Sequence, residues 1–316
     1  MTSNFRLILQ RFGLLIGGGL LLYQIIQGID SFKNNTVNII NLSGILISLI
    51  CTLIALGIQM YAWKILMRDL NVNLSWNSVL KGYLLSFLPR YIPGSIWGYL
   101  SRNEWLYQEY HVDYFVSNIG SILELGTAIL ANIMIVFLYF FYSRIPIWLF
   151  FILASIITVL FWRLFKAAVL FKNNKSNMLW KMIQQISEVK TITLSLSTFL
   201  FLITWTLYGI GLFLIQSSFE PLNSLNLERI TGFTGIYSLA WMVGFFIIFI
   251  PAGLGFRELA LTNLLVTSQG FGNATANATA IISRISVMVA EIGWLILGLI
   301  LLGISSRRRK GQPQQE

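Results

Sequence analysis

Charged residues are scarce in this sequence. They make up 11% of its 316 residues, whereas 56% are hydrophobic. Soluble domains usually carry about 25% charged residues, so the composition excludes a soluble globular fold. The segments between the uncharged windows are shorter than the roughly 50 residues that an independent domain needs. The chain is therefore predicted to be a single transmembrane domain, 1–316, that acts within or at the membrane.

Cysteine and histidine are almost missing: the chain has one of each, Cys51 and His111. A disulfide needs two cysteines, and a Cys/His zinc site needs several such ligands, so the sequence supports neither. The aspartates Asp30, Asp69 and Asp113 form no D-x-D motif. Motifs for nucleotide binding, for serine nucleophiles and for zinc hydrolysis are also missing. These absences predict no metal, no cofactor, no ATP-driven transport and no enzyme chemistry.

Basic residues nevertheless outnumber acidic ones, and the net charge is +10. They gather in loops beside the apolar segments, as the positive-inside rule describes for membrane proteins. Because that rule already explains the charge, no nucleic-acid partner is predicted.

Long apolar runs are what the chain does have. A membrane-crossing helix needs about 20 apolar residues, and the runs predict an all-α polytopic membrane protein with about six full spans. Arg6 and Arg11 precede the first run without a cleavage site, so an uncleaved first helix is expected. The predicted spans are 7–28, 39–63, 117–141, 146–166, 192–217 and 276–304.

The loop charges predict an orientation. Segments 64–81 and 163–190 are rich in lysine and arginine, and Arg307 to Lys310 begin a basic tail, 307–316. These parts are expected in the cytoplasm, together with both termini, while 30–38 and 218–230 face outward. The predicted location is the plasma (inner) membrane, crossed several times.

Two regions, 79–110 and 231–272, are left over. The orientation is consistent only if each returns to the side from which it starts, so both are predicted to be re-entrant hairpins. Aligning Ile92-Pro93 with Ile250-Pro251 relates the two regions at half the chain length. Together these features predict an inverted repeat, 1–143 and 144–306, an arrangement common in transporters.

Proline and glycine interrupt both hairpins. Pro93-Gly94 and the stretch from Pro251 through Gly253 to Gly255 are expected to end one half-helix and begin another. Broken backbone at membrane depth needs protein or a water-filled cavity around it, and half-helix N-termini attract anions. The breaks therefore predict a cavity for an anionic head group; a plain packing kink is the alternative.

Charged residues beside the breaks are the candidate head-group contacts. Arg257 offers a planar donor fork for phosphate, whereas a buried ion pair with Glu258 is the structural alternative. Arg284 and Glu291 share one face of the last span and are candidate partners of Glu258 and Arg257, or of the ligand.

The first hairpin offers a second group of charges. Arg90, Arg102 and Glu104 flank its break, and the arginines either contact a head group or reach the interface as snorkelling cations. Glu124 in the third span is a candidate proton carrier or a structural glutamate. The neighbouring aromatic residues are predicted to form an interfacial belt: Trp97, Tyr99, Trp105 and Tyr107.

Two stretches, RYIPGSIW at 90–97 and PAGLGFRE at 251–258, resemble the signature regions of the lysylphosphatidylglycerol synthase transmembrane family, also called the flippase-like or UPF0104 family. The resemblance covers essentially the whole chain. It implies a membrane module that moves a lipid, here expected to stand alone without the aminoacyl-transferase domain. The residues it marks are Pro251, Gly253, Gly255, Arg257 and Glu258, and also Pro93, Gly94 and Arg102.

The leading hypothesis is a flippase-like protein that translocates an anionic phospholipid or a lipid-linked precursor, with membrane lipids as its partners. Two alternatives stay open. One is a membrane-embedded transferase. The other is a partner subunit that docks a separate cytoplasmic or membrane transferase through the basic segment 163–190. The oligomeric state does not follow from the sequence.

Overall fold

Helices make up every regular element in the part of the chain that the computed structural model describes, which is residues 19, 22–27, 29–30, 39–92, 96–141, 147–171, 178–222, 226–247 and 250–310. The α-helices are α2 (Leu42–Asp69), α3 (Trp76–Phe87), α4 (Trp97–Tyr110), α5 (Tyr114–Phe141), α6 (Ile147–Phe171), α7 (Met178–Glu188), α8 (Thr191–Ser217), α9 (Leu227–Phe246), α10 (Phe256–Gln269) and α11 (Asn273–Lys310). Two short 3-10 turns, η1 (Pro89–Tyr91) and η2 (Pro251–Gly253), interrupt the series. The predicted all-α polytopic fold is confirmed.

Four helices are long and apolar enough to cross a membrane: α2, α5, α8 and the Asn273–Leu301 part of α11. The shortest of them has 27 residues, which gives about 40 Å at 1.5 Å per residue, more than the roughly 30 Å of a hydrocarbon core. They coincide with four of the predicted spans. α6 covers a fifth, and the predicted first span, 7–28, lies mostly outside the described residues.

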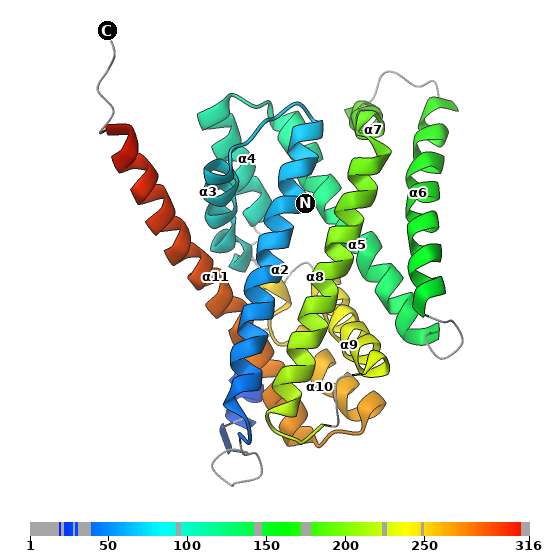
Figure 1. Ribbon diagram of the computed structural model, residues 1–316, viewed down its shortest axis with the longest axis vertical. Coiled ribbons are helices and arrows are strands. Elements are labelled where there is room, and N and C mark those ends of the chain that lie inside the picture. The colour runs from blue at the N-terminus through cyan, green and yellow to red at the C-terminus, as the bar shows by residue number, and fades with distance from the viewer. Residues whose placement is uncertain are drawn as a thin grey trace, which may run out of the picture.

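The other helices form two hairpins at opposite ends of the molecule. α3 and α4 lie beside one end of α2, whereas α9 packs on α8 and α10 packs on α11 toward the opposite end of the molecule (Figure 1). In each hairpin a 3-10 turn separates the two helices, and η1 and η2 contact each other in the interior. Each hairpin returns to the end from which it starts, as expected for a re-entrant segment. The repeat boundaries 1–143 and 144–306 stay a prediction.

Side-chain caps fix where several helices begin. Asn41 accepts a hydrogen bond from the Ser43 amide at 2.9 Å, and Asn226 accepts one from the Arg229 amide at 2.9 Å. Such caps satisfy amides that have no partner within the helix. The first turns of α2 and α9 lie at the same end of the molecule (Figure 1).

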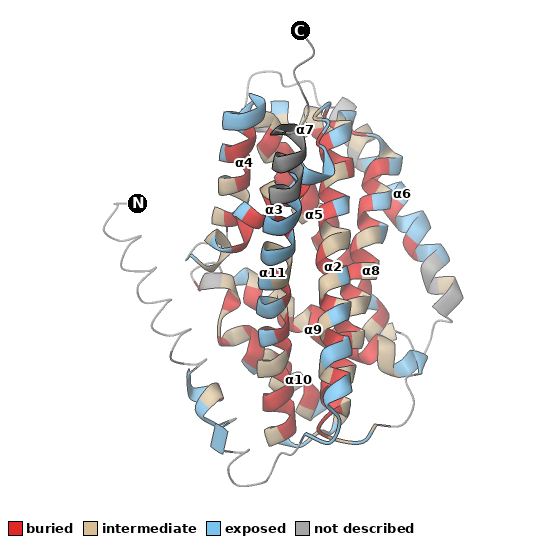
Figure 2. Cartoon of the chain, turned by 60° about the vertical axis from the view of Figure 1, so that its left-hand side comes forward, coloured by how far each residue is buried: buried red, intermediate tan, exposed pale blue. Residues whose placement is uncertain are grey.

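Apolar side chains face both inward and outward. Figure 2 shows buried residues along α5, α8 and α9 and many exposed residues on α6 and α11. The exposed ones are large and apolar, for example Ile156 and Leu160 on α6 and Ile296 and Leu299 on α11. A water-soluble protein rarely exposes so continuous an apolar surface, so these faces contact lipid.

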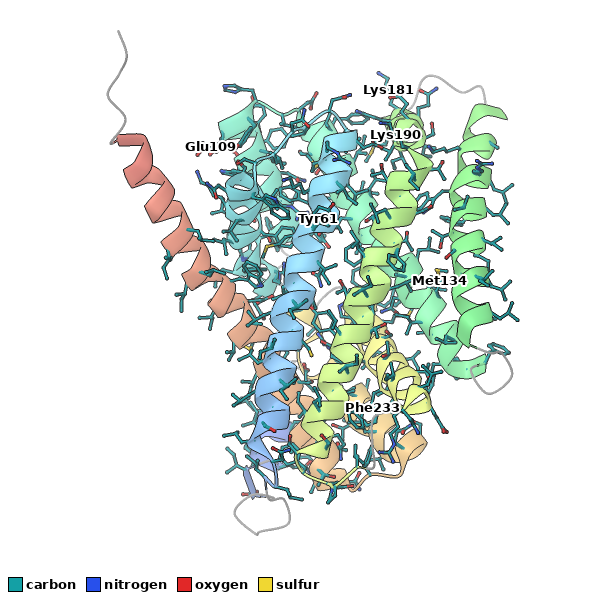
Figure 3. The ribbon with its side chains drawn as sticks, in the orientation of Figure 1. Tyr61, Glu109, Met134, Lys181, Lys190 and Phe233 are labelled. Carbon is teal, nitrogen blue, oxygen red and sulfur yellow. The ribbon has the colours of Figure 1, made fainter. Side chains whose placement is uncertain are left out.

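The basic segment 163–190 includes a short helix that was not predicted. α7 lies at the end of the molecule where α6 finishes, and its Ile186 is buried in the core. Lys181 is exposed at this end, and Lys190 lies close to it (Figure 3). Lys172 and Lys175, which the docking hypothesis also needs, lie outside the described residues.

Candidate functional site

Left-handed backbone shapes the second break. Ala252, Gly253 and Gly255 have φ of 48°, 65° and 79°, a region that side chains with a Cβ atom rarely adopt. A Cβ atom on Gly253 would lie 2.6 Å from the Gly244 Cα atom. Glycine is therefore required at Gly253 both by its φ and by the close approach of η2 to α9.

Close packing also shapes the first hairpin. A Cβ atom on Gly98 would lie 2.7 Å from the Ser86 carbonyl oxygen, so glycine lets α4 pack directly against α3. η1 ends at Tyr91, and the predicted break residues Pro93 and Gly94 lie outside the described residues. Both hairpins thus bring their inner ends to the centre of the molecule.

Glu258 occupies the first turn of α10. Its Oε2 accepts a hydrogen bond from the Gly255 amide at 2.7 Å, while its Oε1 lies 3.7 Å from Arg284 Nη1. The same Arg284 nitrogen donates to the Ala252 carbonyl at 3.2 Å. A carboxylate of the chain itself therefore offsets the positive end of α10, and Arg284 fixes η2 against α11. The predicted pairing of Arg284 with Glu258 agrees with this geometry.

Glu291 joins η1 to α11. Arg90 Nη1 donates to Oε1 at 2.9 Å and the Tyr91 hydroxyl donates to Oε2 at 2.8 Å. Glu291 was predicted as a partner of Arg257 or of the ligand, but its two oxygens bind the first hairpin instead. The Arg90 side chain keeps 32% of its surface exposed, against 6% for Glu291.

A third ion pair lies wholly inside the first half of the chain. Arg102 on α4 donates to Glu124 Oε2 on α5, and the Tyr83 hydroxyl donates to Glu124 Oε1. The Arg102 guanidinium also stacks over the Trp63 ring at 4.2 Å. Arg102 is 1% exposed, so it is a buried structural cation and does not snorkel to the interface.

Arg257 differs from these three arginines. Its guanidinium lies 4.7 Å above the Tyr237 ring, and the residue is 8% exposed. Within the described part of the chain it forms no ion pair, and its Nη2 has no hydrogen-bond partner. The alternative of a reciprocal Arg257–Glu258 pair is therefore wrong, since Glu258 is directed to Gly255 and Arg284.

A cavity of about 210 Å³ lies between the two breaks. It is smaller than the roughly 300–1,000 Å³ of sites that enclose drug-sized ligands, so it suits a head group and not a whole lipid. Six of the predicted residues line it: Arg90, Arg102, Glu124, Arg257, Arg284 and Glu291. The structure thus brings together charges that lie far apart in the sequence.

Other predicted residues have different places. Glu258, Gly253 and Gly255 do not line the cavity, whereas their neighbours Ala252 and Arg257 do, and Pro251 begins η2. Glu104 is exposed, where it accepts hydrogen bonds from Gln108 and Tyr114. Glu104 does not line this cavity, and its role as a head-group contact stays a prediction.

Tyrosine is the residue type that sequence reasoning missed. Tyr83, Tyr91, Tyr208 and Tyr237 line the cavity, as do Trp205 and Trp241. Tyr99 also lines it, and Trp105 is 7% exposed, so for these two the predicted interfacial belt is wrong. Aromatic residues are common at membrane interfaces, which is why their sequence position alone suggested a belt.

Among the described residues no group of three or more histidine, cysteine, aspartate or glutamate side chains is placed to hold a metal ion. The expected lack of a metal or cofactor stays a prediction.

Comparisons with known proteins give one match. A search of curated proteins and a search of solved structures each found none. The family model described as the lysylphosphatidylglycerol synthase TM region matches residues 12–293, which include both hairpins and the cavity. This family indicates a function related to membrane lipids. The chain therefore belongs to the lysylphosphatidylglycerol synthase TM region family.

Proposed function

We propose that this protein translocates an anionic membrane lipid, with the lipid head group bound in the cavity between the two hairpins. The observation that supports the proposal is Arg257, a buried guanidinium that faces the cavity without a carboxylate partner among the described residues. Burying an unpaired charge is costly, and a bound phosphate would supply the missing partner.

Donors from a second arginine support the same ligand. Arg284 Nε and Nη2 are buried without hydrogen-bond partners, as is Arg257 Nη2, and both side chains line the cavity. Two guanidinium groups with free donors suit the oxygens of a phosphate, which arginine binds with a planar fork. The free donors replace the hydration that a phosphate loses on leaving water.

The position of the cavity suits translocation. Re-entrant hairpins from opposite ends meet there, which is the arrangement of transporters that bind substrate near the midplane. Because no nucleotide-binding motif is found in the sequence, movement would run downhill or be coupled to an ion. Glu124 remains the proposed proton carrier, although its two oxygens already accept hydrogen bonds from Arg102 and Tyr83.

The experiment is a scramblase or flippase assay in proteoliposomes with fluorescent phosphatidylglycerol. Arg257→Gln is expected to lower the initial rate at least about tenfold, the effect of losing one charge-assisted hydrogen bond. Lys81→Gln is the matched control, since Lys81 pairs with Glu109 on the exposed surface, outside the cavity. Equal rates in the wild type and Arg257→Gln would reject the proposal.

This proposal assigns no chemical reaction to the chain. The transferase and partner-subunit alternatives stay predictions, and in the described residues we find no contact that favours either. Purified protein that transfers a group without any added partner would replace the proposal with an enzymatic function.

A further inference from the structure

Three aromatic side chains close the cavity toward the end of the molecule where α8 finishes and α9 begins. Tyr208 is the last residue of α8, and Tyr237 the first of α9, among the described residues that line the cavity. Their rings are stacked with centroids 5.1 Å apart, and the Trp205 ring lies 6.0 Å from Tyr208 and 6.4 Å from Tyr237. All three residues are less than 9% exposed. We call this set the aromatic layer.

Buried polar side chains continue beyond the aromatic layer. Asn132 on α5 and Ser238 on α9 are 0% exposed, and Thr234 on α9 is 4% exposed. In the described part of the chain, both amide atoms of Asn132 and the hydroxyls of Thr234 and Ser238 have no hydrogen-bond partner. Buried polar groups are nearly always satisfied, because an unmade hydrogen bond in an apolar interior is costly. Three such residues on two neighbouring helices therefore need an explanation.

Helical spacing places these residues on the faces that line the cavity. Asn132 follows the cavity residues Glu124 and Ala128 at steps of four, and Thr234 precedes Tyr237 by three. Residues three or four apart share one face of a helix, so the polar side chains extend the cavity-facing sides of α5 and α9. The two helices pack on each other.

The packing is closest where α5 approaches the first turns of α9. A Cβ atom on Gly235 would overlap the Tyr139 side chain, and one on Gly209 of α8 would overlap Thr234. The region beyond the aromatic layer is therefore tightly closed in this structure, with Thr234 held between α8 and α9.

On their other faces, α5 and α9 contact lipid. Ile133 and Phe137 on α5 are both 49% exposed, and on α9 Val243 is 42% and Phe246 64% exposed. The wall between the cavity and the bilayer is thus one helix thick at these two helices. Separating them would open the cavity sideways to the lipid while acyl chains stay in the bilayer.

We infer that the lipid head group leaves the cavity between α5 and α9, past the aromatic layer, and that Asn132, Thr234 and Ser238 bind it on the way. This inference rests on the proposed function and names the route of the head group. Amide and hydroxyl groups both donate and accept hydrogen bonds, so they suit phosphate oxygens and the waters that accompany them. The missing hydrogen bonds are then made when the two helices separate.

Cysteine labelling tests whether this region opens to water. In a Cys51→Ser background, Asn132→Cys is treated in lipid nanodiscs with a small anionic methanethiosulfonate, which reacts with thiols in water. Thr52→Cys is the matched control, since Thr52 is 4% exposed, lies outside the cavity lining and donates to the Ser48 carbonyl within α2. Asn132→Cys is expected to react at least about tenfold faster than Thr52→Cys.

The same labelling tests the aromatic layer. Tyr208→Leu removes one ring of the stack and is expected to speed the labelling of Asn132→Cys about tenfold, since a stacked aromatic pair is lost. Tyr208→Phe keeps the ring and loses only the hydroxyl that accepts from Gln59 Nε2, so the labelling rate is expected to stay as it was. Equal labelling rates in these two variants would overturn the role of the layer as the barrier.

Asn132→Leu tests the route in transport. It removes two unpartnered polar atoms without adding volume, so the fold is expected to keep its melting temperature. The initial rate of phosphatidylglycerol translocation in proteoliposomes is expected to fall at least about tenfold, as for one lost hydrogen bond to a charged group in the barrier. Binding of phosphatidylglycerol, measured by native mass spectrometry, is expected to stay unchanged. Thr52→Val is the control for the rate.

The outcomes separate the route from the proposed function. Equal labelling of Asn132→Cys and Thr52→Cys would overturn the route, as would a wild-type translocation rate in Asn132→Leu. If Arg257→Gln slows translocation and Asn132→Leu does not, the route is wrong and the proposed function stands. Fast labelling of Asn132→Cys with no effect of Arg257→Gln would reject the phosphate site and keep the opening between α5 and α9. Weaker lipid binding by Asn132→Leu would assign Asn132 to the cavity and overturn its role beyond the aromatic layer.

Discussion

Arg257 and Arg102 are both buried arginines stacked on aromatic rings, but they differ in what opposes their charge. Arg102 is paired with Glu124, while Arg257 has no ion-pair partner in the described residues. Removing one member of a buried pair strands the other charge. Removing Arg257 leaves no carboxylate unpaired. Replacing the arginine is therefore expected to lower the stability of the fold at position 102 and not at position 257.

We therefore expect Arg102→Met to lower the free energy of unfolding by about 3–5 kcal/mol, because Glu124 is left as an unpaired buried charge. Arg257→Met is expected to keep or raise stability while it lowers lipid binding, since stability and function compete at a binding site. Thermal unfolding in detergent measures both variants. The double variant Arg102→Met/Glu124→Leu is the control and is expected to recover most of the loss. Equal destabilisation by the two single variants would contradict the distinction.

Sequence reasoning found the charged residues of the cavity but not all of their partners. Arg257 and Glu258 are adjacent in the chain, which suggested a pair, yet neighbouring residues of a helix point about 100° apart. Glu291 lies some 200 residues from Arg90 and still binds it. The pairing of these charged residues depends on how the hairpins pack against the long helices. A local sequence pattern carries no information about contacts between residues so far apart in the chain.

At the scale of elements, each hairpin depends on a close approach between its own helices. Helix η2 packs on α9 at Gly244, and α4 packs on α3 at Gly98. Small residues at such contacts let helices approach closely within a membrane, where packing and not the hydrophobic effect drives association. The proline and glycine pattern predicted where the helices break. It did not predict that glycine also forms the contact surface.

Gly253→Ala tests this contact. A residue with a Cβ atom in left-handed backbone costs roughly 1–3 kcal/mol, and here the new atom would also overlap Gly244. We expect a lower melting temperature and loss of lipid translocation. Gly126→Ala is the matched control, because nothing lies within 4 Å of a Cβ atom there and alanine is favoured over glycine in a helix by roughly 0.5–1 kcal/mol. The contact would be refuted if both variants were equally stable.

α11 links the two hairpins at the scale of the whole molecule. It holds the first through Glu291, which binds Arg90 and Tyr91, and the second through Arg284, which binds Ala252 and faces Glu258. Each hairpin is therefore attached to the same helix through residues of its own. α11 is the element through which a bound head group would couple the two ends.

Glu291→Gln is expected to loosen the first hairpin, because a neutral amide cannot replace the ion pair with Arg90. Hydrogen exchange measured by mass spectrometry should become faster in α3, η1 and α4 and change less in α10, which Arg284 holds independently. Glu109→Gln at the exposed Lys81 pair is the control. Equally faster hydrogen exchange in both hairpins would contradict the view that each hairpin is attached to α11 by its own contacts.

The sequence predicts an orientation in the membrane from loop charge, which is a local property, and that orientation stays a prediction. Lys181 and Lys190 lie at one end of the molecule (Figure 3), and α10 lies at the other (Figure 1). The cavity could be predicted only as a consequence of broken helices. Its tyrosine-rich wall could not, since that wall combines residues from α3, α4, α8 and α9.

The positive-inside rule predicts that the end carrying Lys181 faces the cytoplasm of the cell. In a Cys51→Ser background, which removes the chain's single cysteine, Lys181→Cys should react with an impermeant maleimide in inverted vesicles and not in intact cells. Ser268→Cys, exposed near the end of α10, should show the reverse. Because the two sites lie at opposite ends, they must label in opposite preparations if the chain has one orientation. The reverse labelling pattern would mean that the end carrying Lys181 faces away from the cytoplasm. Labelling of both sites in intact cells would mean that the chain inserts in two orientations.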